Sequence, residues 1–284
     1  METTLSDVND GIRESYVGLK DNWGTLMIGS LKSPFKYTGG VTYDPFVTTF
    51  LQARSNGGMS NGVFGSHSFM QNSVSYAVEA AGVKAWVAYS PDESGTAKGS
   101  KGDYTASLKY KIKAFEVFGA AAHDDQTVAA ATSVNYADLS ATGTPLSTTA
   151  STLGQYDSTK VGGAVNLGPV RITLQSEALV SKTLSKVTTQ TGGLAPTVKT
   201  TDILTGKTET AVSFVGVQVK LDKCKLIAQA GQTAVKDAAD KTGYMAAGLF
   251  HQFSKNTSAL AGIMSSKTGD VTKGASSVGL RIVF

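Results

Sequence analysis

The chain has 284 residues, of which 41% are hydrophobic, and a formal net charge of +4. The charge is small and the lysines and arginines are scattered, so no nucleic-acid partner is indicated. Mean hydropathy is −0.05, and no segment reaches the roughly 18 to 20 consecutive apolar residues of a membrane helix. A helical membrane protein is therefore excluded. A membrane β-barrel is not, because its strands alternate lipid-facing and water-facing side chains.

Residue usage favours strands and turns. The chain contains 31 Gly but only 6 Pro, and it is rich in Thr and Ser, which suits many strands joined by turns. The one cysteine, Cys224, excludes an internal disulfide bond. We expect it to be an unreactive buried or turn thiol.

Apolar and polar residues alternate along segment after segment. In 103–112, for example, Tyr104, Leu108 and Tyr110 fall on one face, and Lys109 falls on the other. A period of two is that of a β-strand with one apolar face. The sequence predicts thirteen such strands, at residues 13–20, 23–30, 68–79, 82–90, 103–112, 113–122, 157–167, 169–179, 208–220, 222–233, 241–253, 257–266 and 274–284.

Short and long connections alternate strictly between these strands. The short links are at 21–22, 80–82, 111–113, 168–169, 221–223 and 254–256. The long links are at 31–66, 91–102, 123–156, 181–207, 235–240 and 267–272. In an antiparallel meander this order puts all short turns at one end, as in outer-membrane barrels with short periplasmic turns and long external loops. We therefore predict one all-β domain over 1–284, a transmembrane antiparallel β-barrel, whose closure would also remove exposed sheet edges.

Several segments resemble a known family. "RESYVGLKDNWGTLMIGSLKSPF" followed by "YDPF", then "QNSVSYAVE", "GLFHQFSKNTSALAGIMSS" and the closing "VGLRIVF", are similar in order and spacing to the Gram-negative general porins. The resemblance covers essentially the whole chain. It implies a homotrimer of 16-stranded outer-membrane barrels that passes ions and small hydrophilic solutes, with no cofactor. Outer-membrane lipid, lipopolysaccharide and the barrel assembly machinery are the implied partners.

The resemblance also sets a strand count. In the porin family the constriction loop, which folds back into the lumen, follows the fifth strand, whereas the matching loop 31–66 follows the second predicted strand. About 13 of 16 strands are then present. Residues 1–12 would be the remnant of an external loop, and the signal peptide would have been lost with the N-terminus. The first and last strands would run in the same direction, so we expect a barrel closed by a parallel pair or one with an open seam.

Diffusion through a water-filled barrel needs a polar lining and an electric field, and it needs no nucleophile or metal. The resemblance places Arg13 on the basic wall of the constriction. Asp44 is the only acid of loop 31–66, and Lys32, Lys36 and Arg54 make that loop net positive. The loop therefore predicts a weakly anion-preferring pore.

Alternation adds three residues that are expected to face the lumen, namely Lys109, Arg171 and Glu177. In the final strand, Val278 and Phe284 fall on the apolar face. The resemblance implies that Phe284 is a C-terminal signal read by the barrel assembly machinery.

Two other classes of function compete with a channel. A β-rich surface or adhesin-type structural protein would use its long loops for binding, but its strands would need no lipid-facing belt. An enzyme is not expected, because no Ser/His/Asp set or convergent carboxylate pair stands out. The run His123-Asp124-Asp125 places one His beside two acids without ligand spacing, so no metal site is expected.

Overall fold

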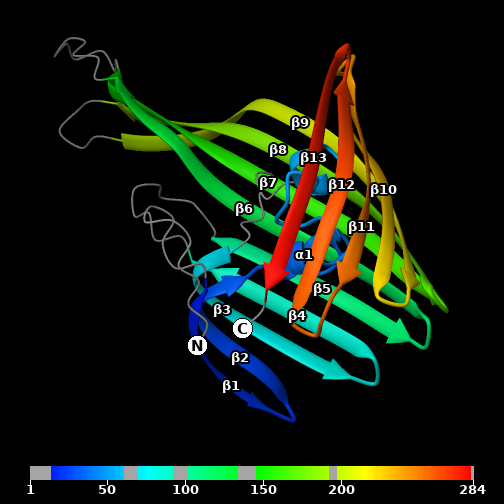
Figure 1. The fold of residues 1–284 in the computed structure, drawn as a ribbon. Helices are drawn as coiled ribbons and strands as arrows, with labels where there is room; N and C mark the ends of the chain where they lie inside the picture. The colour runs from blue at the N-terminus through cyan, green and yellow to red at the C-terminus, as the bar shows by residue number, and fades with distance from the viewer. Residues whose placement is uncertain (1–13, 61–68, 92–101, 134–144, 192–196, 283–284) are drawn as a thin grey trace.

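The computed structural model describes residues 14–60, 69–91, 102–133, 145–191 and 197–282. In these residues thirteen strands form one antiparallel sheet, and each strand pairs with the next along the chain (Figure 1). The prediction of an all-β meander is confirmed. The strands are β1 (Ser15–Asp21), β2 (Gly24–Lys32), β3 (Phe69–Ala80), β4 (Val83–Ser90), β5 (Asp103–Ile112), β6 (Phe115–Ser133), β7 (Pro145–Leu167), β8 (Val170–Thr191), β9 (Thr197–Leu221), β10 (Cys224–Val235), β11 (Lys241–Gln252), β12 (Thr257–Thr268) and β13 (Val271–Ile282).

Helix is scarce in this part of the chain. One four-residue turn, α1 (Pro34–Tyr37), and two 3₁₀ turns, η1 (Gly40–Thr42) and η2 (Ala53–Ser55), lie between β2 and β3. No helix within the described ranges is long and apolar enough to cross a membrane.

Four strands are much longer than the sequence predicts. β6 to β9 have 19 to 25 residues each, and their ribbons extend beyond the rest of the sheet (Figure 1). The predicted loops 123–156 and 181–207 are therefore wrong in extent, because most of each is strand. The extensions are rich in Thr, Ser and Ala. Thr favours strands, but a segment that is polar on both faces shows no alternation from which a strand could be read.

The short connections lie together at one end of the sheet, called here the short-turn end. Most are two-residue hairpin turns, such as Ala81-Gly82, where both residues have positive φ (50° and 80°). Two positive φ values are those of a type I′ turn, whose twist matches that of the flanking strands. These turns fix the register of each hairpin and so decide which residues share a face.

The two edges of the sheet stay apart. β1 pairs with β2 and β13 pairs with β12, and no pairing joins β1 to β13 in the ranges described. Of the two expected arrangements, the structure has the open seam, and the parallel pair is not formed.

The two faces of the sheet differ in polarity. Outward-facing residues are apolar and open, as at Val17 (74% exposed) and Val278 (85% exposed). Inward-facing residues are smaller or polar, and many are covered, as at Ser75 and Thr173. An apolar belt of this extent on the outside of a sheet is the reverse of a soluble domain and fits contact with lipid.

Candidate functional site

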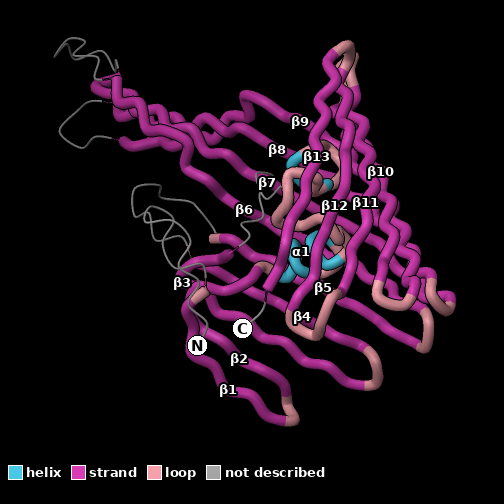
Figure 2. The backbone as a smooth tube through the Cα atoms, viewed as in Figure 1, coloured by secondary structure: helices cyan, strands magenta, loops and turns pink. Residues whose placement is uncertain are grey.

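A loop lies against the inner face of the sheet. Residues 33–60, called here the inner loop, leave β2 and carry the three helical turns (Figure 2). Pro34 stands in the first turn of α1, where its lack of an N–H costs no hydrogen bond.

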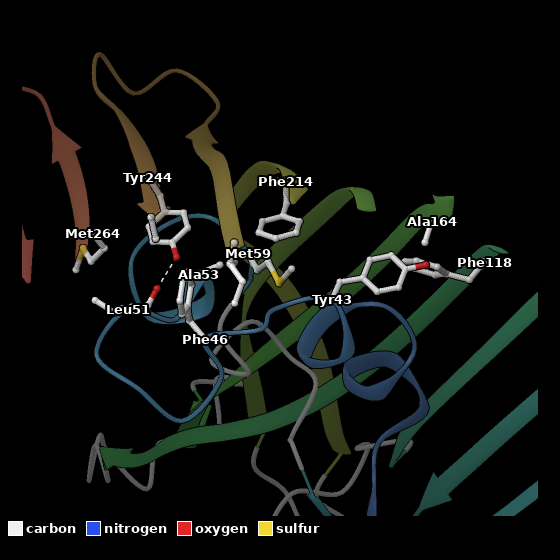
Figure 3. Close-up of a cluster of buried hydrophobic side chains, with 12 residues drawn as sticks. Tyr43, Phe46, Leu51, Ala53, Met59, Phe118, Ala164, Phe214, Tyr244 and Met264 are labelled. Carbon is white, nitrogen blue, oxygen red and sulfur yellow. Dashed lines mark hydrogen bonds between the residues drawn. The ribbon is translucent and has the colours of Figure 1, made fainter. Parts of the chain in front are cut away.

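Apolar side chains form one contact layer (Figure 3). Tyr43, Phe46, Leu51 and Met59 of the inner loop are all buried, and the Tyr43 ring meets the Phe118 ring of β6 edge-on at 5.4 Å. The strand residues of this cluster come from β6, β7 and β9 to β12, and they are Phe118, Ala164, Phe214, Ile227, Tyr244, Ala246 and Met264.

Asp44 holds the inner loop in its folded-back shape. Its Oδ1 accepts hydrogen bonds from the Phe46 N–H (3.0 Å) and from Nε2 of Gln229 on β10 (3.1 Å). Its Oδ2 accepts one from the Ala53 N–H (2.8 Å). The side chain is 2% exposed. Burial raises the pKa of the Asp44 carboxyl, and the bonds from Gln229 and from the two N–H groups oppose that rise.

Polar groups of β10 to β12 reach carbonyl oxygens of the same loop. The Tyr244 hydroxyl donates to the Leu51 carbonyl (Figure 3). Gln229 donates in turn to the Tyr244 hydroxyl. Thr233 Oγ1 donates to the Gly57 carbonyl and Ser266 Oγ donates to the Asn56 carbonyl, each at 2.8 Å. Because these bonds join side chains to backbone, they fix the course of the loop.

The beginning of the inner loop is bound by β5. The Phe35 N–H donates to Thr105 Oγ1 at 3.0 Å, and Thr38 Oγ1 donates to Ser107 Oγ at 2.8 Å. On the next segment, the Gly40 N–H donates to Gln175 Oε1 of β8 at 2.6 Å. The inner loop is therefore hydrogen-bonded to β5, β8, β10, β11 and β12.

Glu177 and Lys160 form a covered pair on β7 and β8. They face each other across the two strands, and each is 3% exposed. Glu177 accepts hydrogen bonds from the Ser60 N–H and Ser60 hydroxyl at the end of the inner loop. Lys160 Nζ lies 4.4 Å from the centre of the Phe35 ring. Alternation places Glu177 on the inner face, where it is expected to face the open lumen. In the structure its carboxylate is instead covered by Ser60 of the inner loop.

Lys109, Arg171 and Glu116 form a second inner cluster, nearer the short-turn end. Lys109 Nζ and Arg171 Nη2 lie 3.7 Å and 3.9 Å from the Glu116 carboxylate. The Tyr43 hydroxyl donates to the same carboxylate at 2.7 Å, and the Arg171 guanidinium carbon is 5.6 Å from the centre of the Tyr43 ring. Burial, and then the bond to Glu116, raise the pKa of Tyr43.

The structure describes all three basic residues of loop 31–66. Lys32 pairs with Glu14 at 2.7 Å, and Lys36 is in the last turn of α1. Arg54 donates to the Gln52 side chain at 2.9 Å, and partial burial lowers the pKa of its guanidinium. Arg13 and Phe284, predicted for the constriction and for assembly, lie outside the described residues.

Sequence reasoning missed the residues that bind the loop, namely Glu116, Lys160, Gln229 and Tyr244. A signal existed for two of them. Alternation in 222–233 puts Gln229 on the same face as Ile227, and alternation in 241–253 puts Tyr244 on the same face as Ala246. Nothing in the local sequence connects that face with a loop nearly 200 residues earlier.

His123 belongs to an outward-facing cluster. Its Nδ1 is 2.7 Å from Asp157 Oδ1, its Nε2 is 3.1 Å from Asp125 Oδ1, and its ring stacks on Tyr104. Lys182 donates to Asp157. Within the part of the chain that the structure describes, no group of three or more His, Cys, Asp or Glu side chains is placed to hold a metal.

Comparison with known proteins gives the family. A family profile described as Gram-negative porin matches residues 2–270. The chain belongs to the Gram-negative porin family. Its place is therefore the outer membrane. No curated protein sequence matches the chain.

Solved structures have the same fold at low sequence identity. A loop-deletion mutant of the outer-membrane protein OmpT of Vibrio cholerae is 15% identical with a TM-score of 0.63, over 95% of this chain and 79% of that chain. A trimer form of in-vitro folded OmpT is 14% identical with a TM-score of 0.61, over 95% and 80%. The Salmonella typhi OmpF complex with daunomycin is 16% identical with a TM-score of 0.54, over 90% and 70%. At these identities the likeness concerns the fold alone.

Proposed function

We propose that this porin forms a water-filled channel for passive diffusion of ions and small hydrophilic solutes, narrowed by the inner loop and weakly preferring anions. One observation carries the proposal. The inner loop is bound inside the sheet by side chains of at least five strands. A loop held in this way narrows the lumen at a fixed position, and charges beside it act on every ion that passes.

The surface of the sheet supports a channel over an adhesin. A surface protein that binds through loops needs no lipid-facing belt around its strands. Here outward residues such as Leu19, Ile263 and Leu280 are each about two-thirds exposed (67%, 65% and 65%) and apolar. This belt would be costly in water and fits the hydrocarbon layer.

A homotrimer is the assembly that we propose, since the similar OmpT chain is described in a trimer form. The apolar outer face would then contact lipid, lipopolysaccharide and neighbouring subunits. Phe284 would serve as the signal for the barrel assembly machinery.

Planar-bilayer recording tests the channel. Purified trimers inserted into a bilayer are expected to give stepwise ionic conductance. A reversal potential in a KCl gradient that indicates a mild excess of chloride over potassium permeability is expected as well. Trimers that insert without conductance steps would refute the proposed channel. Clear cation selectivity would refute the proposed anion preference.

A further inference from the structure

The inner face carries an excess of positive charge at its short-turn end, which is the periplasmic end in a porin. Over β3 to β10, the last inward positions before the turns hold six basic side chains and two acidic ones. The acids are Glu79 and Glu116. The basic residues, called here the basic collar, are Lys84, Lys109, Lys111, Arg171, Lys220 and Lys225.

The pairing register shows that these lysines face inward. Lys225 lies two residues from Ile227, which is buried in the core beneath the inner loop. Lys220 faces Lys225 directly across β9 and β10. On the other side, Lys84 is four residues from Ala88, which pairs with Thr105, and Thr105 binds the inner loop.

Two pairs within the collar bring like charges together. Lys84 is directly opposite Lys109, and Lys220 is directly opposite Lys225. Directly opposed like charges destabilise an antiparallel sheet. Glu79, directly opposite Lys84 on its other side, offsets the first pair, so the repulsion falls mainly on Lys220 and Lys225.

The two acids of this region offset only part of the collar. Glu79 lies directly opposite Lys84 across β3 and β4, and Glu116 lies directly opposite Lys111 across β5 and β6. Glu116 is engaged by Lys109, Arg171 and the Tyr43 hydroxyl, and its side chain is only 10% exposed. None of the ion pairs within the described ranges includes Lys84, Lys220 or Lys225. Lys84 and Lys225 instead lie over the rings of Trp86 and Phe250.

We propose that the basic collar is the main determinant of anion preference and concentrates small anions at the periplasmic side of the inner loop. This inference rests on the proposed channel and locates its selectivity on strands rather than on the loop. A cleft lined by one sign of charge raises the local concentration of counter-ions. A unit charge about 10 Å from a monovalent ion in water changes the local concentration of that ion about twofold before salt screening.

A matched pair of triple variants tests the collar. The first replaces Lys84, Lys220 and Lys225 with Gln. The control replaces Lys113, Lys223 and Lys255 with Gln, three lysines of the short turns at the same end that lie outside the inward rows. Both variants lose three positive charges, and the first removes like-charge repulsion, so it is expected to fold into heat-modifiable trimers.

Reversal potentials are recorded in dilute KCl gradients, where charges act over roughly 30 Å at 0.01 M salt. The collar variant is expected to lower the chloride-to-potassium permeability ratio by at least about twofold. The control is expected to match the parent. The difference between the two variants should shrink in about 1 M KCl, where screening shortens that range to roughly 3 Å.

The outcomes separate the collar from the channel itself. Conductance steps that persist with equal permeability ratios in parent and collar variant would overturn the collar and leave the channel standing. A Lys36→Gln/Arg54→Gln variant that alone abolishes the preference would assign it to the loop and also overturn the collar. If the parent gives no steps at all, the channel is refuted first.

Discussion

Single polar side chains on the inner wall determine where the inner loop lies. Asp44 closes the loop on itself, Gln229 connects it to β10, and Glu177 holds its last described residue. Each of these groups is buried and hydrogen-bonded. Removing one partner of a buried hydrogen bond leaves the other without a substitute from water, which costs more than the bond itself contributes.

Replacing Asp44 with Ala is expected to loosen the inner loop. The N–H groups of Phe46 and Ala53 and the Gln229 amide would lose their acceptor, at a cost of about 1 to 3 kcal/mol for each buried group left unpaired. Single-channel recordings should show larger current fluctuations, and proteases should cut the loop faster in intact trimers. Phe50→Ala is the control, because Phe50 is 80% exposed in the same loop. Equal behaviour of the two variants would contradict the role of Asp44.

Acid should tighten the attachment of Asp44. Burial raises its pKa above 3.8, the ordinary value for Asp. A raised pKa favours the protonated form in the folded loop, so its stabilisation is complete below about pH 4 and is lost as pH rises through the raised pKa. Proteolysis of the loop should accelerate over that rise. The Asp44→Asn side chain has one acceptor oxygen fewer, so its loop should be cut faster than that of the parent at low pH. Because Asn does not titrate, the rate for this variant should not change with pH. An unchanged pH profile in the Asn variant would assign the effect elsewhere.

At the scale of elements, the inner loop and β10 touch backbone to backbone. A Cβ atom on Gly231 would lie 2.5 Å from the Gly58 Cα and 2.6 Å from its carbonyl oxygen. Both are backbone atoms, so a side chain here can be accommodated only if the loop moves. Position 231 of β10 therefore requires glycine, because any side chain there would overlap the backbone of the inner loop.

Gly231→Ala is accordingly expected to displace the second half of the inner loop and to raise single-channel conductance. Gly243→Ala on β11 is the matched control, because a Cβ atom there meets nothing within 4 Å. The control should keep parental conductance and thermal stability of the trimer. Parental conductance in both variants would show that the loop yields without changing the lumen.

Whole-molecule stability depends on the outer apolar belt. Val278 and Gly279 are adjacent on β13 and lie on opposite faces, and Val278 is 85% exposed. Val278→Arg would put a charge against lipid or a neighbouring subunit, at about 2 to 4 kcal/mol if it lies near the bilayer midplane. Gly279→Arg adds the same charge to the inner face, where a Cβ atom meets nothing within 4 Å.

Heat or urea denaturation of trimers in lipid should therefore show a clear loss of stability for Val278→Arg and a small change for Gly279→Arg. In the opposite result, with Gly279→Arg the less stable variant, the two faces would have been assigned the wrong way round.

Prediction from sequence succeeded where one face of a strand is apolar. The segments that contain Lys109 and Arg171 both alternate clearly. The strands predicted there, 103–112 and 169–179, agree with β5 and with the short-turn end of β8. It failed in the polar extensions of β6 to β9, where neither face is apolar and period two carries no signal. Only part of the site could be predicted from the sequence. Alternation places Glu177 on the inner face, but it cannot show that the Ser60 N–H donates a hydrogen bond to the Glu177 carboxylate.

The sequence by itself determined the strand order, the inner and outer faces and the family, because these follow from local period and from the length of connections. Only the tertiary structure decided what the inner residues do. Asp44 is buried and holds the inner loop, and Lys220 lies directly opposite Lys225 on the adjacent strands β9 and β10. In the described ranges β1 does not pair with β13. These outcomes depend on contacts between segments distant in the chain, and no local pattern of residues encodes such contacts.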